Sequence, residues 1–255
     1  MAIRTTEAVV LKTQPFRNAS LIVTAFTRDF GKIQGLAKGI RRRCDRKDTR
    51  YHCYLEPLTL DKIVYYEKNR SQLYAITQCD LLNQFQAIRR DLKKLIAASF
   101  ILEFVEKGTS LSDPGTKDVY RLLVDSLEVL CLEKNIDQVL LLFEIKFLGI
   151  SGFMPQVKAC ARCGSKGLDA AKFSILNGGL VCRVCSAQDI SAVSISKGAI
   201  ASMLHLAKDK RLNIKRFKLT GKVEEELKGI MYEFVKMHFS GEFKTLEFME
   251  KVKNG

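Results

Sequence analysis

The first third of the chain places apolar residues in short runs separated by turn-forming residues. Runs of four to eight residues that are rich in β-branched and aromatic side chains are typical of strands. Such runs lie at 8–11, 20–27, 32–40, 58–66 and 73–77. Gln14-Pro15 is expected to end the first strand, and Asp29-Phe30-Gly31 to form the turn after the second. Five short strands predict a small barrel, and the OB-fold is the five-stranded barrel of this size.

From residue 85 the apolar positions recur at steps of three and four. Over 85–107 this spacing predicts one amphipathic helix. The same periodicity predicts further helices over 118–132, 137–148, 197–208 and 223–239. Ser196 is the expected N-cap of the helix that begins at Lys197. Strands followed by helices indicate an α+β protein with more than one domain.

Two CxxC pairs, eighteen residues apart, interrupt the helical part of the chain. They are Cys160-Ala161-Arg162-Cys163 and Cys182-Arg183-Val184-Cys185, and Gly164 directly follows the first pair. Two CxxC turns that face each other can close a tetrahedron of thiolates around Zn²⁺. The alternative is four ordinary reduced thiols. With four cysteine ligands the site has no open position for a substrate, so it is expected to stabilise a small module and not to catalyse.

The cysteine pattern divides the sequence into four predicted segments. The predicted domains are an OB-fold barrel at 1–82, a first helical part at 83–155, a zinc-binding module at 156–189 and a second helical part at 190–255. If the helices on the two sides of the module belong together, the module is an insertion in a helical bundle domain.

The net charge of +14 is distributed unevenly. Residues 31–50 contain eight Lys and Arg side chains, Lys32 among them, against two Asp, which favours a polyanionic partner. Tyr51, Tyr54, Tyr65 and Tyr66 lie nearby in the sequence, where aromatic rings could stack on bases. Taken singly, each tyrosine is expected to pack rather than stack. The alternative for the basic run is a solvated loop, and the same two interpretations apply to a second basic stretch at 208–218.

No enzymatic motif accompanies these features in the sequence. The chain lacks GxxxxGK[ST], GxGxxG, HExxH and GxSxG, and its three histidines are far apart in sequence. Gly35 and Gly39 are expected where a strand bends or where another group, such as an extended ligand, approaches its backbone. The sequence therefore predicts a binding protein with no catalytic residues and no small-molecule substrate.

The sequence also suggests a compartment. No apolar run is long enough to span a membrane, and residues 1–6 show no signal-peptide core. Eight cysteines with a zinc pattern predict a reducing cytoplasm, with no membrane partner. Four of these cysteines lack metal spacing and are expected to be plain thiols: Cys44, Cys53, Cys79 and Cys131.

Three groups of short motifs, taken in order and spacing, are specific to one family. They are 20–24, 26–32 and 37–42; 143–148 with Gly152 and Pro155; and 160–164 with Phe173-Ser174, Gly178-Gly179, Cys182 and Cys185. On these residues the chain resembles the RecO family of bacterial DNA-repair and recombination mediators over essentially its whole length. Asn18 departs from the acidic residue that is usual in the family.

The resemblance implies an N-terminal OB-fold, a helical domain and a zinc-binding insertion. It also implies non-enzymatic work near the nucleoid: members bind single- and double-stranded DNA, anneal strands, engage the C-terminal tail of the single-strand-binding protein SSB, and load RecA together with RecR. Lys38, Arg41 and Arg42 fall in the basic motif of the family, whereas Arg43 and Arg46 are DNA-binding candidates on charge alone. The alternatives are a zinc-bearing RNA- or ribosome-associated adaptor and a protein scaffold.

Overall fold

The protein is described from a computed structural model. The structure describes residues 2–38, 55–67, 73–111, 117–168, 170–208, 218–219, 221–238, 243–245 and 248. The chain divides into two compact units, Met1–Leu132 with Thr245–Gly255, and Glu133–Lys244. The four-segment division expected from the sequence stays a prediction.

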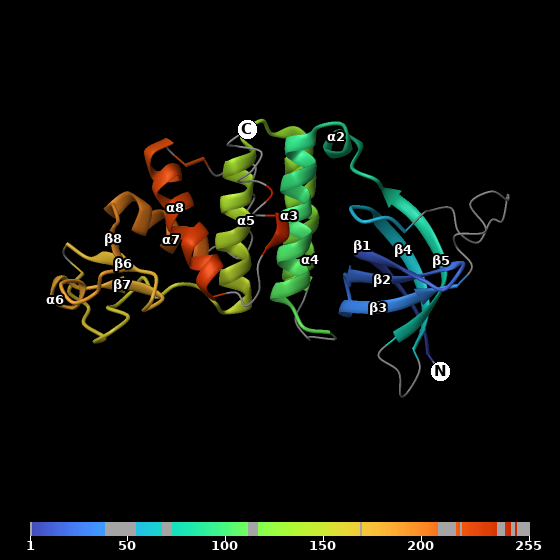
Figure 1. The fold of residues 1–255 in the computed structure, drawn as a ribbon, viewed down its shortest axis with the longest axis horizontal. Helices are drawn as coiled ribbons and strands as arrows, with labels where there is room; N and C mark the ends of the chain where they lie inside the picture. Colours follow the sequence, from blue (N-terminus) through green and yellow to red (C-terminus); the bar gives the residue numbers. More distant parts are fainter. Residues whose placement is uncertain are drawn as a thin grey trace. The chain divides into compact units, whose positions relative to one another are not determined.

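The first unit begins with a closed five-stranded barrel (Figure 1). Its strands are β1 (Ala2–Phe16), β2 (Ser20–Thr27), β3 (Gly31–Ala37), β4 (Leu60–Glu67) and β5 (Leu73–Asn83). They follow the order β1-β2-β3-β5-β4, and β1 pairs with β4 to close the barrel. The β3–β5 pair is parallel and the other four pairs are antiparallel. The predicted five-stranded OB-type barrel is confirmed.

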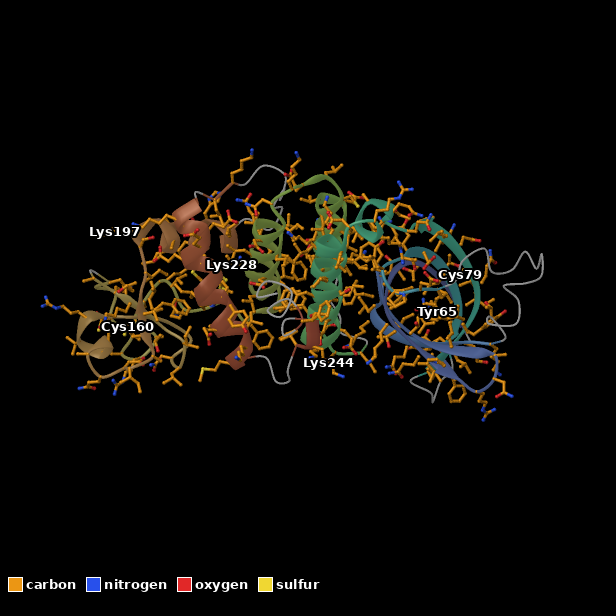
Figure 2. The ribbon with its side chains drawn as sticks, turned by 45° about the horizontal axis from the view of Figure 1, so that its top comes forward. Tyr65, Cys79, Cys160, Lys197, Lys228 and Lys244 are labelled. Carbon is orange, nitrogen blue, oxygen red and sulfur yellow. The ribbon has the colours of Figure 1, made fainter. Side chains whose placement is uncertain are left out.

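Alternate residues of the strands fill the barrel. β3 shows the pattern most plainly, since its seven residues alternate between buried and half-buried. Tyr65 and Cys79, labelled in Figure 2, lie in the barrel. They belong to the same buried cluster as Ile33, Ile63 and Ile76.

Gly35 stands where the β3 backbone has a close neighbour. A Cβ added at Gly35 would lie 2.6 Å from side-chain carbons of Ile76, a distance that side chains do not tolerate. The group that approaches this strand is therefore a core side chain and not a ligand. Gly39 lies outside the described residues.

Several strand ends differ from the sequence-based prediction. β1 does not end at Gln14-Pro15 but continues to Phe16, because a tight hairpin pairs Pro15 with Leu21 and Phe16 with Ser20. A proline is tolerated beside such a strand end, where a missing N–H costs little. β5 continues to Asn83, because it pairs with β4 up to Leu60.

The helix predicted over 85–107 is two helices, α2 (Gln86–Arg89) and α3 (Leu92–Gly108). The prediction of one helix is wrong because Asp91 is an N-cap: its side chain accepts hydrogen bonds from the backbone N–H groups of Lys93 and Lys94. α4 (Lys117–Leu132) follows and packs on both α2 and α3. The carbonyl of Cys131 near its end accepts a 2.9 Å hydrogen bond from Lys94 Nζ.

The long helices described in the second unit are α5 (Ile136–Ser151), α7 (Lys197–Lys208) and α8 (Gly221–His238). α5 packs against both α7 and α8 and ends at Gly152, which adopts the left-handed conformation. The predicted N-cap of α7 is confirmed, since Ser196 Oγ accepts a 3.1 Å hydrogen bond from the Ala199 N–H. None of the described helices is long and apolar enough to cross a membrane.

The cysteine-bearing module also belongs to the second unit. It contains β6 (Lys172–Ser174), β7 (Gly179–Val181), the short helix α6 (Arg183–Ser186) and β8 (Ala192–Ser194), and its sheet has the order β7-β6-β8. The buried ring of Phe173 in β6 packs edge-on against Phe234 of α8, with ring centroids 6.2 Å apart. The module is thereby joined to the helices of its unit by aromatic packing.

Candidate metal centre and nucleic-acid interface

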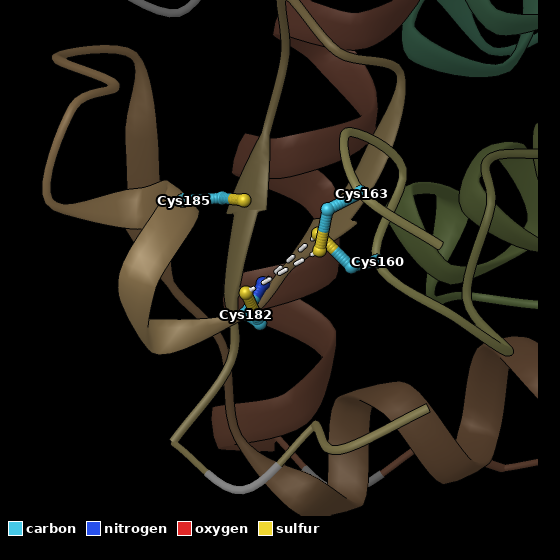
Figure 3. A group of neighbouring side chains, drawn as sticks. All are labelled: Cys160, Cys163, Cys182 and Cys185. Atoms are coloured by element: carbon cyan, nitrogen blue, oxygen red, sulfur yellow. Dashed lines mark hydrogen bonds between the residues drawn. The ribbon is translucent and has the colours of Figure 1, made fainter. Parts of the chain in front are cut away.

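The two CxxC pairs meet in space (Figure 3). The four Sγ atoms of Cys160, Cys163, Cys182 and Cys185 all lie within 4.8 Å of one another. The first pair lies on a turn that precedes β6, Cys182 directly follows β7 as the N-cap of α6, and Cys185 lies in α6. Figure 3 shows the four thiols directed toward a common centre.

The first cysteine pair is shaped by a tight backbone turn. The Gly164 N–H donates to the Cys160 carbonyl at 2.9 Å, and the Cys160 N–H donates to the Ser165 carbonyl at 2.8 Å. Gly164 has a φ of 75°, a value that a side chain disfavours. The glycine after the first CxxC is therefore required by the turn, as the sequence predicts.

The second cysteine pair contacts the first directly. Cys182 has extended backbone and its N–H points at the Cys160 sulfur, with an N–S distance of 3.4 Å. Its own sulfur lies 3.9 Å from the sulfur of Cys163. Backbone N–H groups aimed at sulfur stabilise thiolate charge, as they do for oxyanions.

Four thiols at this distance cannot all ionise without a cation. Burial acts to raise the pKa of Cys160, but three neighbouring backbone N–H groups outweigh it and lower that pKa to about 6. The pKa of Cys185 rises to about 12, through burial and through the hydrogen bonds of its three fellow cysteines. A metal ion bound at the centre would hold all four cysteines as thiolates.

The geometry suits a tetrahedral metal ion with sulfur ligands. Zn–S bonds of about 2.3 Å place the corners of a tetrahedron roughly 3.8 Å apart. The 3.9 Å contact between Cys163 and Cys182 is close to this value. The residues present therefore fit Zn²⁺, and all four positions would be filled by protein.

A second polar cluster stabilises the module beside the cysteines. The Asp189 carboxylate accepts hydrogen bonds from the Ser191 N–H at 2.9 Å, the Ser191 hydroxyl at 2.7 Å, the Asn177 amide at 2.8 Å and the Ser174 hydroxyl. The hydrogen bonds from the Ser174 and Ser191 hydroxyls contribute most to lowering the pKa of Asp189 to about 2. This carboxylate is committed to internal bonds and not to a ligand.

The basic candidates begin where β3 ends. Lys38 is exposed in the turn that directly follows Ala37. The other four candidates, Arg41, Arg42, Arg43 and Arg46, lie outside the described residues, and so does most of the 208–218 stretch.

Of the four tyrosines, Tyr65 and Tyr66 are described. Tyr65 is 2% exposed and its ring lies 5.1 Å from that of Tyr74, so it packs in the barrel core and is not available for stacking. Tyr66 is half-buried on β4. Tyr51 and Tyr54 lie outside the described residues.

Lys32, one of the eight basic residues of 31–50, has partners within the first unit. Its Nζ donates to the carbonyls of Glu106 and Thr109 at the end of α3. Burial lowers the pKa of Lys32, although Glu106 opposes this shift. The sequence around Lys32 could not predict these two hydrogen bonds, because both acceptors lie more than seventy residues further along the chain.

One of the four cysteines outside the CxxC pairs differs from its prediction as a plain thiol. Cys79, buried in the barrel, takes part in a disulfide bond, so its prediction as a plain thiol is wrong. Cys131 is a free, half-buried thiol, as predicted. Cys44 and Cys53 lie outside the described residues.

The protein is an α+β protein of the OB-fold class, because it combines a closed five-stranded barrel with helices. It also carries a module whose four cysteines could hold a metal ion. Comparison with known families gives the particular family. The model described as "Recombination protein O N terminal" matches residues 1–85, and "Recombination protein O C terminal" matches residues 89–247. The chain belongs to the RecO family.

Curated relatives match the chain over nearly its full length. "DNA repair protein RecO" of Caldanaerobacter subterraneus subsp. tengcongensis is 32% identical over 251 residues, which cover 98% of each chain. The protein of the same name from Syntrophus aciditrophicus is 29% identical over 254 residues, which cover 97% of this chain and 95% of the relative. The resemblance inferred from the sequence is confirmed.

Proposed function

We propose that this protein is a DNA-repair and recombination mediator that binds single- and double-stranded DNA, anneals complementary strands and, together with RecR, helps to load RecA onto SSB-coated DNA. The proposal rests on the position of the basic run in a RecO-family barrel. Lys38 is exposed directly after strand β3, and the basic run follows it in the sequence. OB-fold barrels commonly hold extended nucleic acid.

The proposed mechanism is electrostatic and not catalytic. Annealing brings two negatively charged backbones together, so a protein that neutralises phosphates on both strands lowers the barrier without reading bases. Lys38, Arg41 and Arg42, with Arg43 and Arg46, would hold one strand. Part of the 208–218 stretch, where Lys218 is exposed, would hold the other.

The proposed protein partners are RecR and the acidic C-terminal tail of SSB. A binding site for such a tail needs an apolar contact surrounded by lysine or arginine. We assign this site to the helical parts, 83–155 with 190–255. A peptide that copies the tail is expected to bind with roughly micromolar affinity, about −8 kcal/mol. Titration of the whole chain, with the peptide contacts mapped by cross-linking, tests this assignment. Cross-links confined to the barrel would overturn it.

The metal in this proposal is one structural Zn²⁺, held by Cys160, Cys163, Cys182 and Cys185. It would supply folding energy to the module and no chemistry to a substrate. We place the protein in the cytoplasm, associated with the nucleoid, and assign it no enzymatic activity.

The decisive experiment compares affinities for single-stranded DNA, duplex DNA and RNA across a series of salt concentrations. Binding to both DNA forms, with log affinity falling linearly as log salt rises, is the expected result. A marked preference for RNA would favour an RNA- or ribosome-associated adaptor. Absence of nucleic-acid binding at low salt would leave a protein scaffold as the remaining class.

A further inference from the structure

The four cysteines of the metal centre differ in their exposure. Cys160, Cys182 and Cys185 are buried, with exposed fractions of 2%, 8% and 9%. Cys163 is exposed. A small oxidant that approaches the centre from solvent therefore meets the sulfur of Cys163 before that of any other ligand.

The exposed sulfur also has a suitable second sulfur beside it. Cys163 Sγ lies 3.9 Å from Cys182 Sγ, and the four sulfurs of the centre all lie within 4.8 Å of one another. A disulfide has an S–S bond of about 2.05 Å, so the two sulfurs need to approach by roughly 2 Å. Cys163 ends an exposed turn, and Cys182 is the N-cap residue between β7 and α6, so a rotation of the Cys163 side chain would bring the two sulfurs together.

We propose that Cys163 is an oxidation site, at which peroxides convert the metal centre into a Cys163–Cys182 disulfide and release the metal. The inference rests on the proposed Zn²⁺ occupancy. Cys163 thiolate attacks one oxygen of hydrogen peroxide, the O–O bond breaks, and the products are a Cys163 sulfenic acid and hydroxide. Cys182 thiolate then attacks the Cys163 sulfur and displaces a second hydroxide as the disulfide forms. Two thiolates thus give up two electrons, which reduce one peroxide to two hydroxides.

The structural consequence follows from the loss of two ligands at once. Cys160 and Cys185 alone cannot complete a tetrahedral site, so the module loses the metal that stabilises its short strands. Phe173 of β6 packs on Phe234 of α8, and this contact carries the change from the module to the helices of its unit. Peroxide would therefore alter the second unit without touching the barrel strands.

The test uses the purified full-length protein with its metal bound. Hydrogen peroxide is added, metal release is followed with a chromogenic chelator, and the first disulfide is located by alkylation and mass spectrometry. The informative variant is Cys163→His, because histidine is a good zinc ligand that cannot form a disulfide. The matched control is Cys131→Ser, which removes a free thiol whose pKa burial raises and which lies outside the centre.

We expect one metal ion released per chain, with Cys163 joined to Cys182 as the first product. Cys163→His should retain its metal and release it at least an order of magnitude more slowly, whereas Cys131→Ser should behave as wild type. Equal release from Cys163→His, or a first disulfide within either CxxC pair, would overturn the inference while leaving the zinc proposal intact. Reduced protein that contains no zinc when freshly purified would overturn both.

Discussion

Lys32 Nζ donates a 2.5 Å hydrogen bond to the backbone carbonyl of Glu106, which lies 74 residues further along the chain. It also donates to the carbonyl of Thr109, and the Lys32 backbone bridges to that of Leu111. The last carbonyls of a helix lack partners within the helix and carry the negative end of its dipole. Lys32 of β3 therefore caps the C-terminal end of α3 and links this helix to the barrel by hydrogen bonds.

Replacing Lys32 by methionine should destabilise the first unit. The two carbonyls lose a charged donor, and the expected cost is about 2 kcal/mol, measured by denaturant unfolding followed in the barrel. Lys12→Met is the control, because Lys12 forms a 3.9 Å surface pair with Glu106 and should change stability little. Equal effects of the two substitutions would contradict the assigned role of Lys32.

Asp61 is a buried acid in the barrel whose ionisation should be costly. It is 0% exposed, its Oδ2 accepts a 2.6 Å hydrogen bond from Thr59, and its Oδ1 has no partner among the described residues. Burial raises its pKa to about 6 from 3.8, although the Thr59 bond opposes the shift. The folded protein thus binds this proton more tightly than the unfolded chain, so stability should fall as pH rises from about 4 to 6.

Asp61→Asn should therefore stabilise the barrel at neutral pH. A shift of about two pKa units corresponds to an upper bound of roughly 3 kcal/mol, and the gain should vanish below pH 4, where the wild-type acid is protonated. Thermal unfolding between pH 4 and 7.5 measures both effects. Asp80→Asn, in β5, is the control; if it flattened the pH dependence as much, Asp61 would not be its source.

Gly179 and Gly229 should respond in opposite ways to alanine. A Cβ at Gly179 would lie 2.3 Å from the Gln156 carbonyl oxygen, within a backbone bridge that admits no side chain. A Cβ at Gly229, in α8, meets nothing within 4 Å. Gly179→Ala should make the module sensitive to protease, whereas Gly229→Ala should stabilise the helix by up to about 1 kcal/mol. A protease-resistant Gly179→Ala protein would contradict the described bridge.

Removing the metal should unfold the module and leave the barrel folded. Freshly purified protein is expected to contain one zinc per chain, and Cys182→Ser should lose it. Residues 156–189 should then be cut by protease while the barrel remains resistant, because the metal supplies most of the stability of so small a module. Metal analysis and mapped proteolytic fragments provide the two measurements. Cooperative unfolding of the barrel in the same variant would show that the metal stabilises more than its module.

Replacing Lys38, Arg41 and Arg42 together by alanine should weaken DNA binding without regard to sequence. Each lost phosphate contact reduces the slope of log affinity against log salt by roughly 0.7 on single-stranded DNA, so the triple change should reduce it by about 2. Annealing should fall with it, while zinc content and thermal stability stay near wild type. If the variant anneals strands normally and the slope of log affinity against log salt is unchanged, these three residues do not form the DNA interface. The 208–218 stretch would then be the leading candidate.

Local patterns predicted local structure well, because the interactions that decide it are close in sequence. The two CxxC turns, Gly164 and the Ser196 cap all depend on neighbours within a few residues, and all are as predicted. The break at Asp91 was missed because an acid between apolar positions also suits an exposed helix face. The roles of Lys32 and Asp61 depend on partners or burial that only the folded barrel creates.

The barrel is held together unequally around its circumference. Among the residues that the structure describes, β3 and β5 pair at four positions, 34–37 with 73–76, whereas every other pair of strands matches seven or eight. Fewer hydrogen bonds must break here than between the other strands, so we expect the barrel to open first between β3 and β5. The strand that leads into the basic run would then be the one that separates from its neighbour.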